Sequence, residues 1–321
     1  MNAAWRPTAP AAALRLRAAL LARARAFFAE RGVLEVETPI LSEAGTSDPQ
    51  IDSLTTRVRG IATPLYLSTS PEYAMKRLLA AGSGDIYQIC KAFRDGERGR
   101  WHNPEFTMIE WYRLGFDDAA LMTEVEALVA NLLAPNRQLP AAERLSYAAA
   151  LSRHAGVDAH SAGERELAAA AAALGIHCDA ALDRDARLDL LMGLAVGPKL
   201  GRERPCFVCD YPAAQASLAR LKPGAPRVAA RFEFYVDGLE LANGFHELSS
   251  AAEQRARFAR DLQTRRMRGL AAPAIDERLL AALTAGLPDC AGVALGFDRL
   301  TAIAAGAHSV REAMAFPIDS A

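Results

Sequence analysis

Hydrophobic residues near the start of the chain recur at helical spacing. Over residues 13–31 apolar side chains alternate with arginines at one-turn intervals, which predicts an amphipathic helix. Gly32 follows where a glycine that ends a helix belongs. Residues 1–12 are rich in alanine and proline, and we expect a flexible N-terminus there. Residues 33–41 alternate like a strand, which Pro39 limits to a sheet edge or a strand end.

Two strand-like runs follow, at 85–95 and 105–114, joined by a loop at 96–104. Before them, 64–82 reads as a strand, a turn at Ser70-Pro71 and a helix. Proline at a first helical position and an acid in the first turn both suit a helix start.

The second half of the chain changes character twice. Residues 117–200 are mostly helical in pattern, with turns between 135 and 140 and near Gly156 and Gly175. Strand patterns return at 205–212 and at 228–248, the latter with a hairpin turn at Asp237-Gly238. A charged helix is predicted at 251–269, and a glycine-rich strand that turns into a helix at 292–306.

Hairpin links outnumber regular strand–helix–strand alternation in this order of elements. That pattern favours a mainly antiparallel sheet flanked by helices, an α+β fold. We expect a single domain over 13–321 with a mostly helical insertion at about 117–200.

Composition narrows the class of protein. The 321 residues include 37 basic and 38 acidic side chains, a net charge of −1, so we expect no stable nucleic-acid binding over a wide surface. The sequence has neither a run of membrane-spanning length nor the pattern of a secretory signal, so we expect no membrane association and a cytoplasmic location. Of five cysteines, Cys206 and Cys209 form a C-x-x-C, which suits either half a zinc site or redox pair, or two small apolar residues in a strand.

Nucleotide-binding glycine cradles are missing from the sequence. It contains no G-x-x-x-x-G-K-[ST] and no G-x-G-x-x-G after a strand pattern, and the G-x-G at 82–84 connects a helix to a strand. If the protein binds ATP, it uses neither common cradle.

The loop 96–104 and its flanking strands form the first cluster with chemical potential. Arginines at a strand-to-loop corner can clamp phosphate through paired hydrogen bonds. Alternation puts Phe106, Met108, Glu110 and Tyr112 on one face of the returning strand, and Thr107, Ile109 and Trp111 on the other. The second set has the composition of core. The first suits a ligand-binding surface, although a hairpin with one wet face would also explain it.

Two carboxylates form the second cluster. Glu240 lies in an apolar run, where a carboxylate is costly unless paired or bound to a metal, and Glu247 follows seven residues later. Seven is odd, so a regular strand would put them on opposite faces. If they share a metal, the strand must bulge, and we expect the bulge at Asn243-Gly244. Two carboxylates beside a nucleotide suit magnesium.

The third cluster is the segment "GVALGFDRL" at 292–300. Glycines in a strand allow a ligand to approach the backbone, and Arg299 falls in the first turn of the next helix, a good phosphate address. The alternative is a glycine-containing strand followed by an exposed arginine.

Together, these clusters resemble the catalytic domain of class II aminoacyl-tRNA synthetases. "FFAERGVLEVETPIL", "FRDGERGRWHNPEFTMIEWY" and "GVALGFDRL" are similar to its three motifs in order, and "SPE", "HNPEFTM" and "ELANGFHEL" look specifically like lysyl-tRNA synthetase. Two features depart from that enzyme: the first motif begins too early for an N-terminal OB-fold anticodon domain, and Ala294 stands where glycine is typical. Both are similar to the elongation factor P–(R)-β-lysine ligase family, the truncated paralogues of lysyl-tRNA synthetase.

This resemblance implies a function. The family activates (R)-β-lysine with ATP and transfers it to a lysine side chain of elongation factor P, so the implied cofactors are ATP and Mg²⁺. The first motif implies a homodimer. We keep open another amino-acid ligase, a synthetase-like enzyme that charges tRNA, and a non-catalytic paralogue that only binds a ligand. Both the helical segment 117–200 and the arginine-rich helix 251–269 are candidates for docking the partner protein.

The resemblance also implies roles for individual residues. Arg94 would bind the α-phosphate and Arg299 the γ-phosphate as the catalytic pair, while Phe106 would stack on adenine. Glu240 and Glu247 would place magnesium, and Glu247 could also face a substrate ammonium group. The remaining ATP-binding set would be Asp95, Gly96, Glu97, His102, Asn103, Leu241 and Gly296, and the amino-acid pocket would comprise Ser70, Pro71, Glu72, Tyr112, Asn243 and Ala294.

One position breaks the pattern. The synthetases have an acid that reads adenine two residues after the first arginine, where this chain has Gly96. We expect either a shifted loop that presents Glu97, or adenine read by backbone groups.

Overall fold

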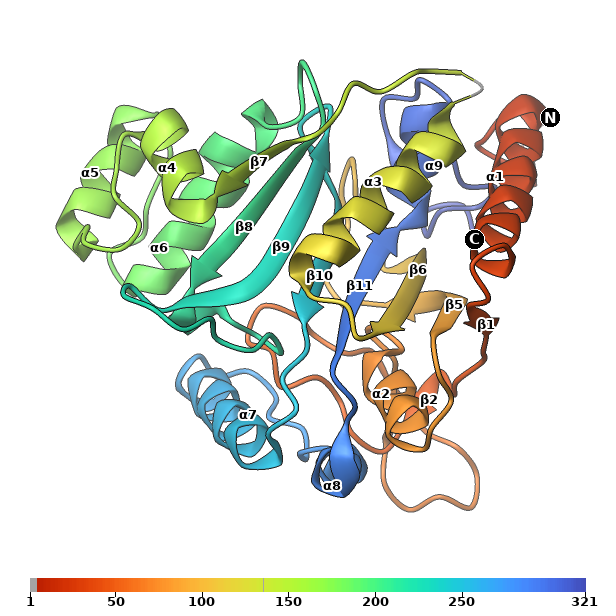
Figure 1. Cartoon of the computed structure of the whole chain (residues 1–321), viewed down its shortest axis with the longest axis horizontal. Helices are drawn as coiled ribbons and strands as arrows, with labels where there is room; N and C mark the ends of the chain where they lie inside the picture. Colours follow the sequence, from red (N-terminus) through yellow and green to blue (C-terminus); the bar gives the residue numbers. More distant parts are fainter. Residues whose placement is uncertain (1–4, 135) are drawn as a thin grey trace. The chain divides into compact units, whose positions relative to one another are not determined.

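The computed structural model describes residues 5–134 and 136–321 (Figure 1). By internal contacts the chain divides into two compact units, which we describe separately. Unit 1 comprises Met1–Gly115, Asn131–Arg137 and Leu248–Ala321, and unit 2 comprises Phe116–Ala130 and Gln138–Glu247. The predicted insertion at 117–200 lies almost wholly in unit 2, but unit 2 also contains the strands that follow it. The expectation of a single domain stays a prediction.

Unit 1 is built on a sheet with the strand order β1-β5-β6-β11. These strands are β1 (Leu34–Glu35), β5 (Ile86–Phe93), β6 (Glu105–Leu114) and β11 (Cys290–Gly296). The β1–β5 pair is parallel, and the β5–β6 and β6–β11 pairs are antiparallel. A small antiparallel sheet with the order β2-β4-β3 stands apart from it, formed by β2 (Leu41–Ser42), β3 (Thr55–Thr56) and β4 (Leu65–Leu67).

Helices of unit 1 complete its layers. They are α1 (Ala11–Ala29), α2 (Glu72–Ala80), α7 (Ala251–Met267), α8 (Glu277–Gly286), α9 (Phe297–Ala304) and the short η4 (Val310–Glu312). Helix α1 packs Phe28 against Tyr87 of β5, with ring centroids 4.3 Å apart, and against Trp111 of β6 at 5.4 Å. These rings lie on the sheet face for which the sequence predicted core residues.

Helix α1 ends as its sequence predicts. Gly32 has a φ of +67°, its N–H donates to the carbonyl of Ala29, and the N–H of Val33 donates to the carbonyl of Phe28. This pattern is a Schellman ending, which needs a left-handed residue at the glycine position.

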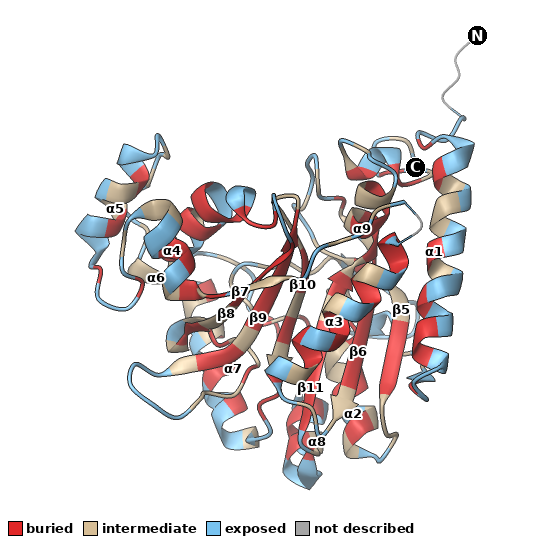
Figure 2. Cartoon of the chain, turned by 45° about the horizontal axis from the view of Figure 1, so that its top comes forward, coloured by how far each residue is buried: buried red, intermediate tan, exposed pale blue. Residues whose placement is uncertain are grey.

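Unit 2 has the strand order β10-β9-β8-β7. Its strands are β7 (Glu143–Ser146), β8 (Cys206–Pro212), β9 (Val228–Val236) and β10 (Leu239–His246), with β7 parallel to β8 and the other pairs antiparallel. Asp237 and Gly238 both have positive φ, which confirms the predicted hairpin turn. Within unit 2, strands β8 and β9 are largely buried (Figure 2).

Helices cover one face of the unit 2 sheet. They are α4 (Tyr147–Ala155), α5 (Glu164–Ala173), α6 (Arg184–Leu191) and the short η1 (Met192–Val196) and η2 (Gly197–Lys199); α3 (Asp118–Leu133) begins in this unit, and η3 (Ala213–Gln215) follows β8. Leu151, Leu167 and Leu188 share one buried cluster with Val208 and Tyr235 of the strands. Antiparallel pairing thus dominates sheets flanked by helices, and the α+β prediction is confirmed.

Some boundaries differ from the prediction. The run 33–41 is not one strand but two short ones, β1 and β2, because Pro39 offers no N–H and the backbone leaves the β5 edge after Val36. Strand β7 and helix α8 were not predicted. Of the segment expected to be flexible, residues 1–4 lie outside the described part, whereas Thr8 donates a backbone hydrogen bond to Ala315 and Ala9 is buried.

Candidate active site

The face of β6 that the sequence selected carries a buried carboxylate. Glu110 is 2% exposed and lies directly opposite Gln88 of β5 and Ala294 of β11. Tyr112 donates its hydroxyl to Glu110 Oε1 at 2.7 Å, so the two side chains share a face. The register therefore confirms the predicted alternation, and it shows that the Ala294 methyl group neighbours Glu110.

Arg94 stands at the end of β5, where the 96–104 loop begins. Its Nε donates to the carbonyl of Thr69 at 3.4 Å, and its guanidinium lies over the ring of Phe106 at 5.1 Å. Glu97 approaches it at 3.5 Å, a long contact between two partly exposed side chains. The structure thus brings Arg94, Phe106 and Glu97 together, and Glu97 is the loop acid that faces this arginine.

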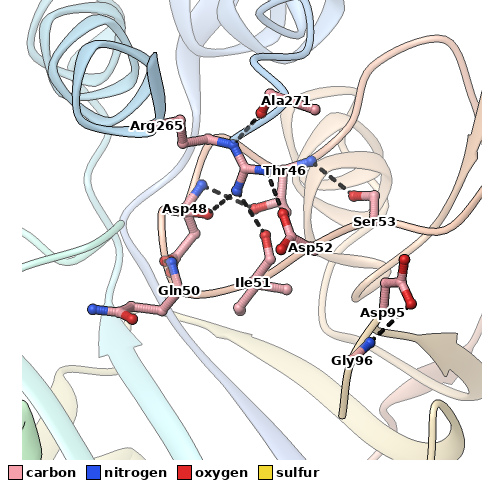
Figure 3. Close-up of polar contacts among 10 residues, drawn as sticks. All are labelled: Thr46, Asp48, Gln50, Ile51, Asp52, Ser53, Asp95, Gly96, Arg265 and Ala271. Carbon is pink, nitrogen blue, oxygen red and sulfur yellow. Dashed lines mark hydrogen bonds and ion pairs between the residues drawn. The ribbon is translucent and has the colours of Figure 1, made fainter. Parts of the chain in front are cut away.

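The first residues of the loop are shaped by a turn. Gly96 has a φ of +74°, and its N–H donates to Asp95 Oδ1 at 2.9 Å (Figure 3). Residues other than glycine rarely adopt this backbone conformation, so an aspartate or glutamate at this position would be strained. The glycine that breaks the synthetase pattern is therefore also the residue that this turn requires.

His102 and Arg299 meet at the far side of the same loop. Arg299 lies in the first turn of α9 and donates to the carbonyl of Trp101 at 3.1 Å, and its Nη2 is 2.7 Å from His102 Nε2. Desolvation of the ring, followed by the positive charge of Arg299, holds the pKa of His102 below its usual range. A neutral imidazole at neutral pH can accept this hydrogen bond.

Asn103 has a different setting from the one we predicted for a nucleotide contact. It is buried; its Nδ2 donates to the carbonyl of Glu105 at 2.6 Å and its Oδ1 accepts the N–H of Ile318 at 3.0 Å. A second bond to the C-terminal segment comes from Arg100, whose Nε donates to the carbonyl of His308. Asn103 thus ties the loop to this segment, and direct contact with the nucleotide stays a prediction.

The predicted amino-acid pocket residues Ser70, Pro71 and Glu72 lie at the start of α2. Ser70 Oγ accepts the N–H of Glu72 at 3.0 Å. Pro71 is the N-cap residue of α2, whereas the sequence predicted it at the first helical position. Glu72 Oε1 pairs at 2.7 Å with Lys76, whose side chain is 1% exposed. This pairing fixes the orientation of the Glu72 carboxylate.

In unit 2, the predicted magnesium ligand Glu240 lies in β10, and Glu247 follows directly after the strand, in an isolated bridge with Ala219. The register against β9 shifts between Glu240 and Ala242, so the bulge lies at Leu241 and not at Asn243-Gly244 as predicted. Leu241, an expected ATP-binding residue, is itself buried there. The single extra residue turns the odd separation of Glu240 and Glu247 into an even one, and alternation then puts both carboxylates on one side.

A buried ion pair supports this face from β9. Arg231 Nη2 donates to Glu233 Oε1 at 2.6 Å, and Tyr235 donates its hydroxyl to Glu233 Oε2. Arg231 Nε also donates to Asn243 Oδ1 at 3.3 Å, which holds one predicted pocket residue. Sequence reasoning missed this network. Its signal was the alternation of Arg231, Glu233 and Tyr235 with phenylalanines.

The residues present fit magnesium as an ion that bridges protein and nucleotide. Within residues 5–134 and 136–321, no group of three or more His, Cys, Asp or Glu side chains is arranged to hold a metal. Magnesium bound with a nucleotide uses one or two carboxylates plus phosphate oxygens, so the oxygen donors of Glu240 and Glu247 have the required chemistry.

The C-x-x-C pair has the character of core. Cys206 is buried and Cys209 half-buried in β8, and burial raises the pKa of each thiol to about 12. Thiols that stay protonated are poor metal ligands and poor nucleophiles. The interpretation as small apolar residues in a strand fits these surroundings.

Among the helices that the structure describes, none is long and apolar enough to cross a membrane.

Comparisons with known proteins cover almost the whole chain. The family model described as tRNA synthetases class II (D, K and N) matches residues 3–320. Proteins named elongation factor P–(R)-β-lysine ligase from Klebsiella pneumoniae (strain 342) and Salmonella enteritidis PT4 (strain P125109) are each 50% identical to this chain over 326 aligned positions. Each match covers 100% of this chain and 99% of the relative.

Proposed function

Because the chain belongs to the class II tRNA synthetases of the D, K and N type and, among them, to the elongation factor P–(R)-β-lysine ligases, we propose that it activates (R)-β-lysine with ATP and joins it to a lysine side chain of elongation factor P. The observation that carries the proposal is 50% identity over the full length of ligases with that name. The proposal makes the protein an ATP-dependent ligase, with the cytoplasm as its place of action.

The first step is formation of an adenylate. A carboxylate oxygen of the amino acid attacks the α-phosphorus of ATP, the bond to the bridging oxygen breaks, and pyrophosphate leaves. Arg94 would hold the α-phosphate and stabilise the charge that develops there, and Arg299 would hold the γ-phosphate. The Arg94 guanidinium contacts the Thr69 carbonyl and, at 3.5 Å, Glu97, and the Arg299 guanidinium contacts the Trp101 carbonyl and His102. When bound, Mg²⁺ would neutralise phosphate charge, and Glu240 and Glu247 would hold it.

The second step is transfer. The amine nitrogen of the partner's lysine attacks the adenylate carbonyl, an amide bond forms, AMP leaves with the electrons of the broken bond, and the amine loses a proton to solvent. No protein nucleophile is required, because the adenylate is already an activated acyl group. The protein supplies positioning and charge, and positioning alone accounts for a large part of such rate enhancements.

The amino-acid pocket is proposed on the Glu110 face of unit 1. Glu110 and Glu72 are carboxylates suited to the two ammonium groups of a lysine isomer, and Tyr112 holds Glu110 in place at 2.7 Å. The Ala294 methyl group, directly across from Glu110, narrows the space beside that carboxylate. We propose that it disfavours α-lysine, whose amino group stands one carbon nearer the carboxylate.

A homodimer is part of the proposal. Leu34, Ile40 and Leu41 are 55%, 41% and 42% exposed in the segment that resembles the first synthetase motif. Several exposed apolar residues in one segment fit a protein–protein interface. Equilibrium sedimentation at several concentrations tests this point, and a single monomer mass throughout would refute it.

The test of the function is pyrophosphate exchange with (R)-β-lysine, (S)-β-lysine and α-lysine, followed by incubation with ATP and elongation factor P. We expect exchange to be fastest with (R)-β-lysine, and we expect the mass of elongation factor P to increase by one lysyl unit. Preference for α-lysine together with charging of tRNA would support the synthetase-like alternative instead. A lack of exchange with every amino acid would overturn the enzyme assignment.

A further inference from the structure

Arg265, in the last turn of α7, is a buried cation that none of the predicted roles uses. It is 2% exposed, and its guanidinium reaches the segment 46–53 that links β2 to β3 (Figure 3). Nη1 donates to the carbonyls of Asp48 and Ile51 at 2.7 and 2.9 Å, Nη2 pairs with Asp52 Oδ1, and Nε donates to the carbonyl of Ala271. Every nitrogen of the guanidinium therefore has an acceptor.

These contacts fix the path of the backbone through the segment. Local turns contribute, because Asp48 Oδ1 accepts the N–H of Gln50 at 2.8 Å and Ser53 Oγ accepts the N–H of Thr46. In addition to these bonds, Arg265 ties Asp48 on one side of the turn to Asp52 on the other, and links both to helix α7. A planar guanidinium with several donors suits this task better than an ammonium group.

From this segment, the connection continues to the 96–104 loop through backbone groups. The carbonyl of Asp52 accepts the N–H of Asp95 at 2.8 Å, and Asp95 Oδ1 accepts the N–H of Gly96. On the other side of the same corner, Arg94 donates its backbone N–H to the carbonyl of Pro104 at 2.9 Å. The arginine proposed to bind the α-phosphate thus lies between two backbone anchors. The anchor at Asp52 is held in place by Arg265.

We propose that Arg265 is a positioning residue for adenylate formation: it holds segment 46–53 against the corner of the loop and thereby fixes the direction of Arg94. The inference rests on the proposed function, because it needs ATP to be the ligand of Arg94. Arg265 itself touches neither substrate nor the reacting atoms. Its effect comes through the Asp52 carbonyl and the Asp95 N–H.

The variants that test it are Arg265→Met, which removes the donors and keeps much of the volume, and Arg265→Lys, which keeps the charge but lacks the fork. Arg266→Ala is the matched control, because Arg266 is the next residue and is exposed. Asp52→Asn is a milder change, because the Asp52 side chain is 48% exposed and its backbone carbonyl is retained. Thermal unfolding of each variant checks that the fold is intact.

Two readouts separate positioning from general stability. In pyrophosphate exchange, we expect Arg265→Met to raise the KM for ATP about tenfold and to leave the KM for the amino acid within about twofold, because a small misplacement of a catalytic group is enough for such a loss. Arg265→Lys should recover part of the loss, and Arg266→Ala should match the parent protein. By hydrogen exchange, amides of residues 94–97 and 46–53 should exchange faster in Arg265→Met, and those of β6 should not.

The outcomes divide cleanly. The inference would be overturned if Arg265→Met changed neither the KM for ATP nor the hydrogen exchange of amides 94–97. Equal rises in the KM for ATP and the KM for the amino acid would also overturn it. If Arg265→Met does not fold, then Arg265→Lys and Asp52→Asn decide in the same way. If the parent protein shows no exchange with any amino acid, the proposed function fails instead, and hydrogen exchange alone still tests the link from Arg265 to the loop.

Discussion

Arginines near the sheets of the two units are held in opposite ways. In unit 1, Arg94 is held by a carbonyl and an aromatic ring, with Glu97 3.5 Å away, and Arg299 is held by a carbonyl and by a neutral imidazole. In unit 2, Arg231 is locked to Glu233 at 2.6 Å in a setting where both side chains are largely buried. A long ion pair between partly exposed side chains leaves Arg94 attractive to phosphate, whereas the close and largely buried pair of Arg231 and Glu233 supports the fold.

The strongest test of this contrast is Arg94→Ala. We expect pyrophosphate exchange to fall by about 10³-fold or more, because the charge developing on the α-phosphate loses its main partner, while the free energy of unfolding changes little. Exchange kinetics and urea denaturation measure the two effects on one sample. Arg59→Ala, at an exposed position, is the control. Survival of exchange in Arg94→Ala would mean that another group binds the α-phosphate.

Arg231→Met should show the reverse behaviour. It leaves the Glu233 carboxylate buried without its cation, which typically costs about 3–5 kcal/mol in the free energy of unfolding. Urea denaturation measures the loss, and Arg227→Met, at an exposed position in the preceding loop, controls for the change in residue type. If stability is unchanged while exchange activity is lost, Arg231 belongs with the catalytic arginines and the contrast is wrong.

Ala294→Gly tests whether the apolar residue opposite Glu110 determines the selectivity between (R)-β-lysine and α-lysine. Removing one methyl group across from Glu110 should move the ratio of kcat/KM values toward α-lysine by about tenfold, the usual range for one methylene-sized difference in a pocket. Ala291→Gly, three residues earlier and on the opposite face of β11, has the same backbone cost and should leave the ratio unchanged. Equal ratios in all three proteins would remove Ala294 from the selectivity argument.

The smallest effect concerns a carboxylate of unit 1 that lacks the close pairing of Glu233. Burial, followed by the nearby Asp48, raises the pKa of Asp261 to about 6; Ser47 donates to it, and Arg257 and Arg260 also face it. A raised carboxyl pKa means that the folded state binds the proton more tightly, so this group favours folding at low pH and disfavours it as pH rises through 6.

Asp261→Asn should therefore stabilise the protein at pH 8, by on the order of 1 kcal/mol after allowing for the partial exposure of the side chain, and have little effect at pH 4. Melting temperatures of the variant and the parent protein are compared across this pH range. Asp276→Asn is unsuitable as a control, because Asp276 caps α8. Asp117→Asn is equally unsuitable because its carboxylate accepts the Ala120 N–H. The parent protein is therefore the reference, and an equal shift at both pH values would contradict the assignment.

Alternation along strands could be read from the sequence, and long-range contacts could not. Strand β6 was predicted over the residues it occupies, because the run is rich in aromatic and β-branched residues and contains neither glycine nor proline. The β10 bulge was predicted two residues too late: Asn243-Gly244 is a strong local turn signal, but the register with β9 decides where the extra residue falls. The role of Arg265 could not be predicted because two of its acceptors are main-chain carbonyls more than 200 residues away, and carbonyls have no sequence signature.

The bulge at Leu241 also constrains how this segment can change. Because it sets the parity of the spacing between Glu240 and Glu247, an insertion or deletion of one residue between them would turn one carboxylate to the opposite face. The segment can accept substitutions far more readily than changes in length. A one-residue gap there, in an aligned homologue or a designed variant, would mark a protein that has kept both acids and lost the magnesium site proposed for them.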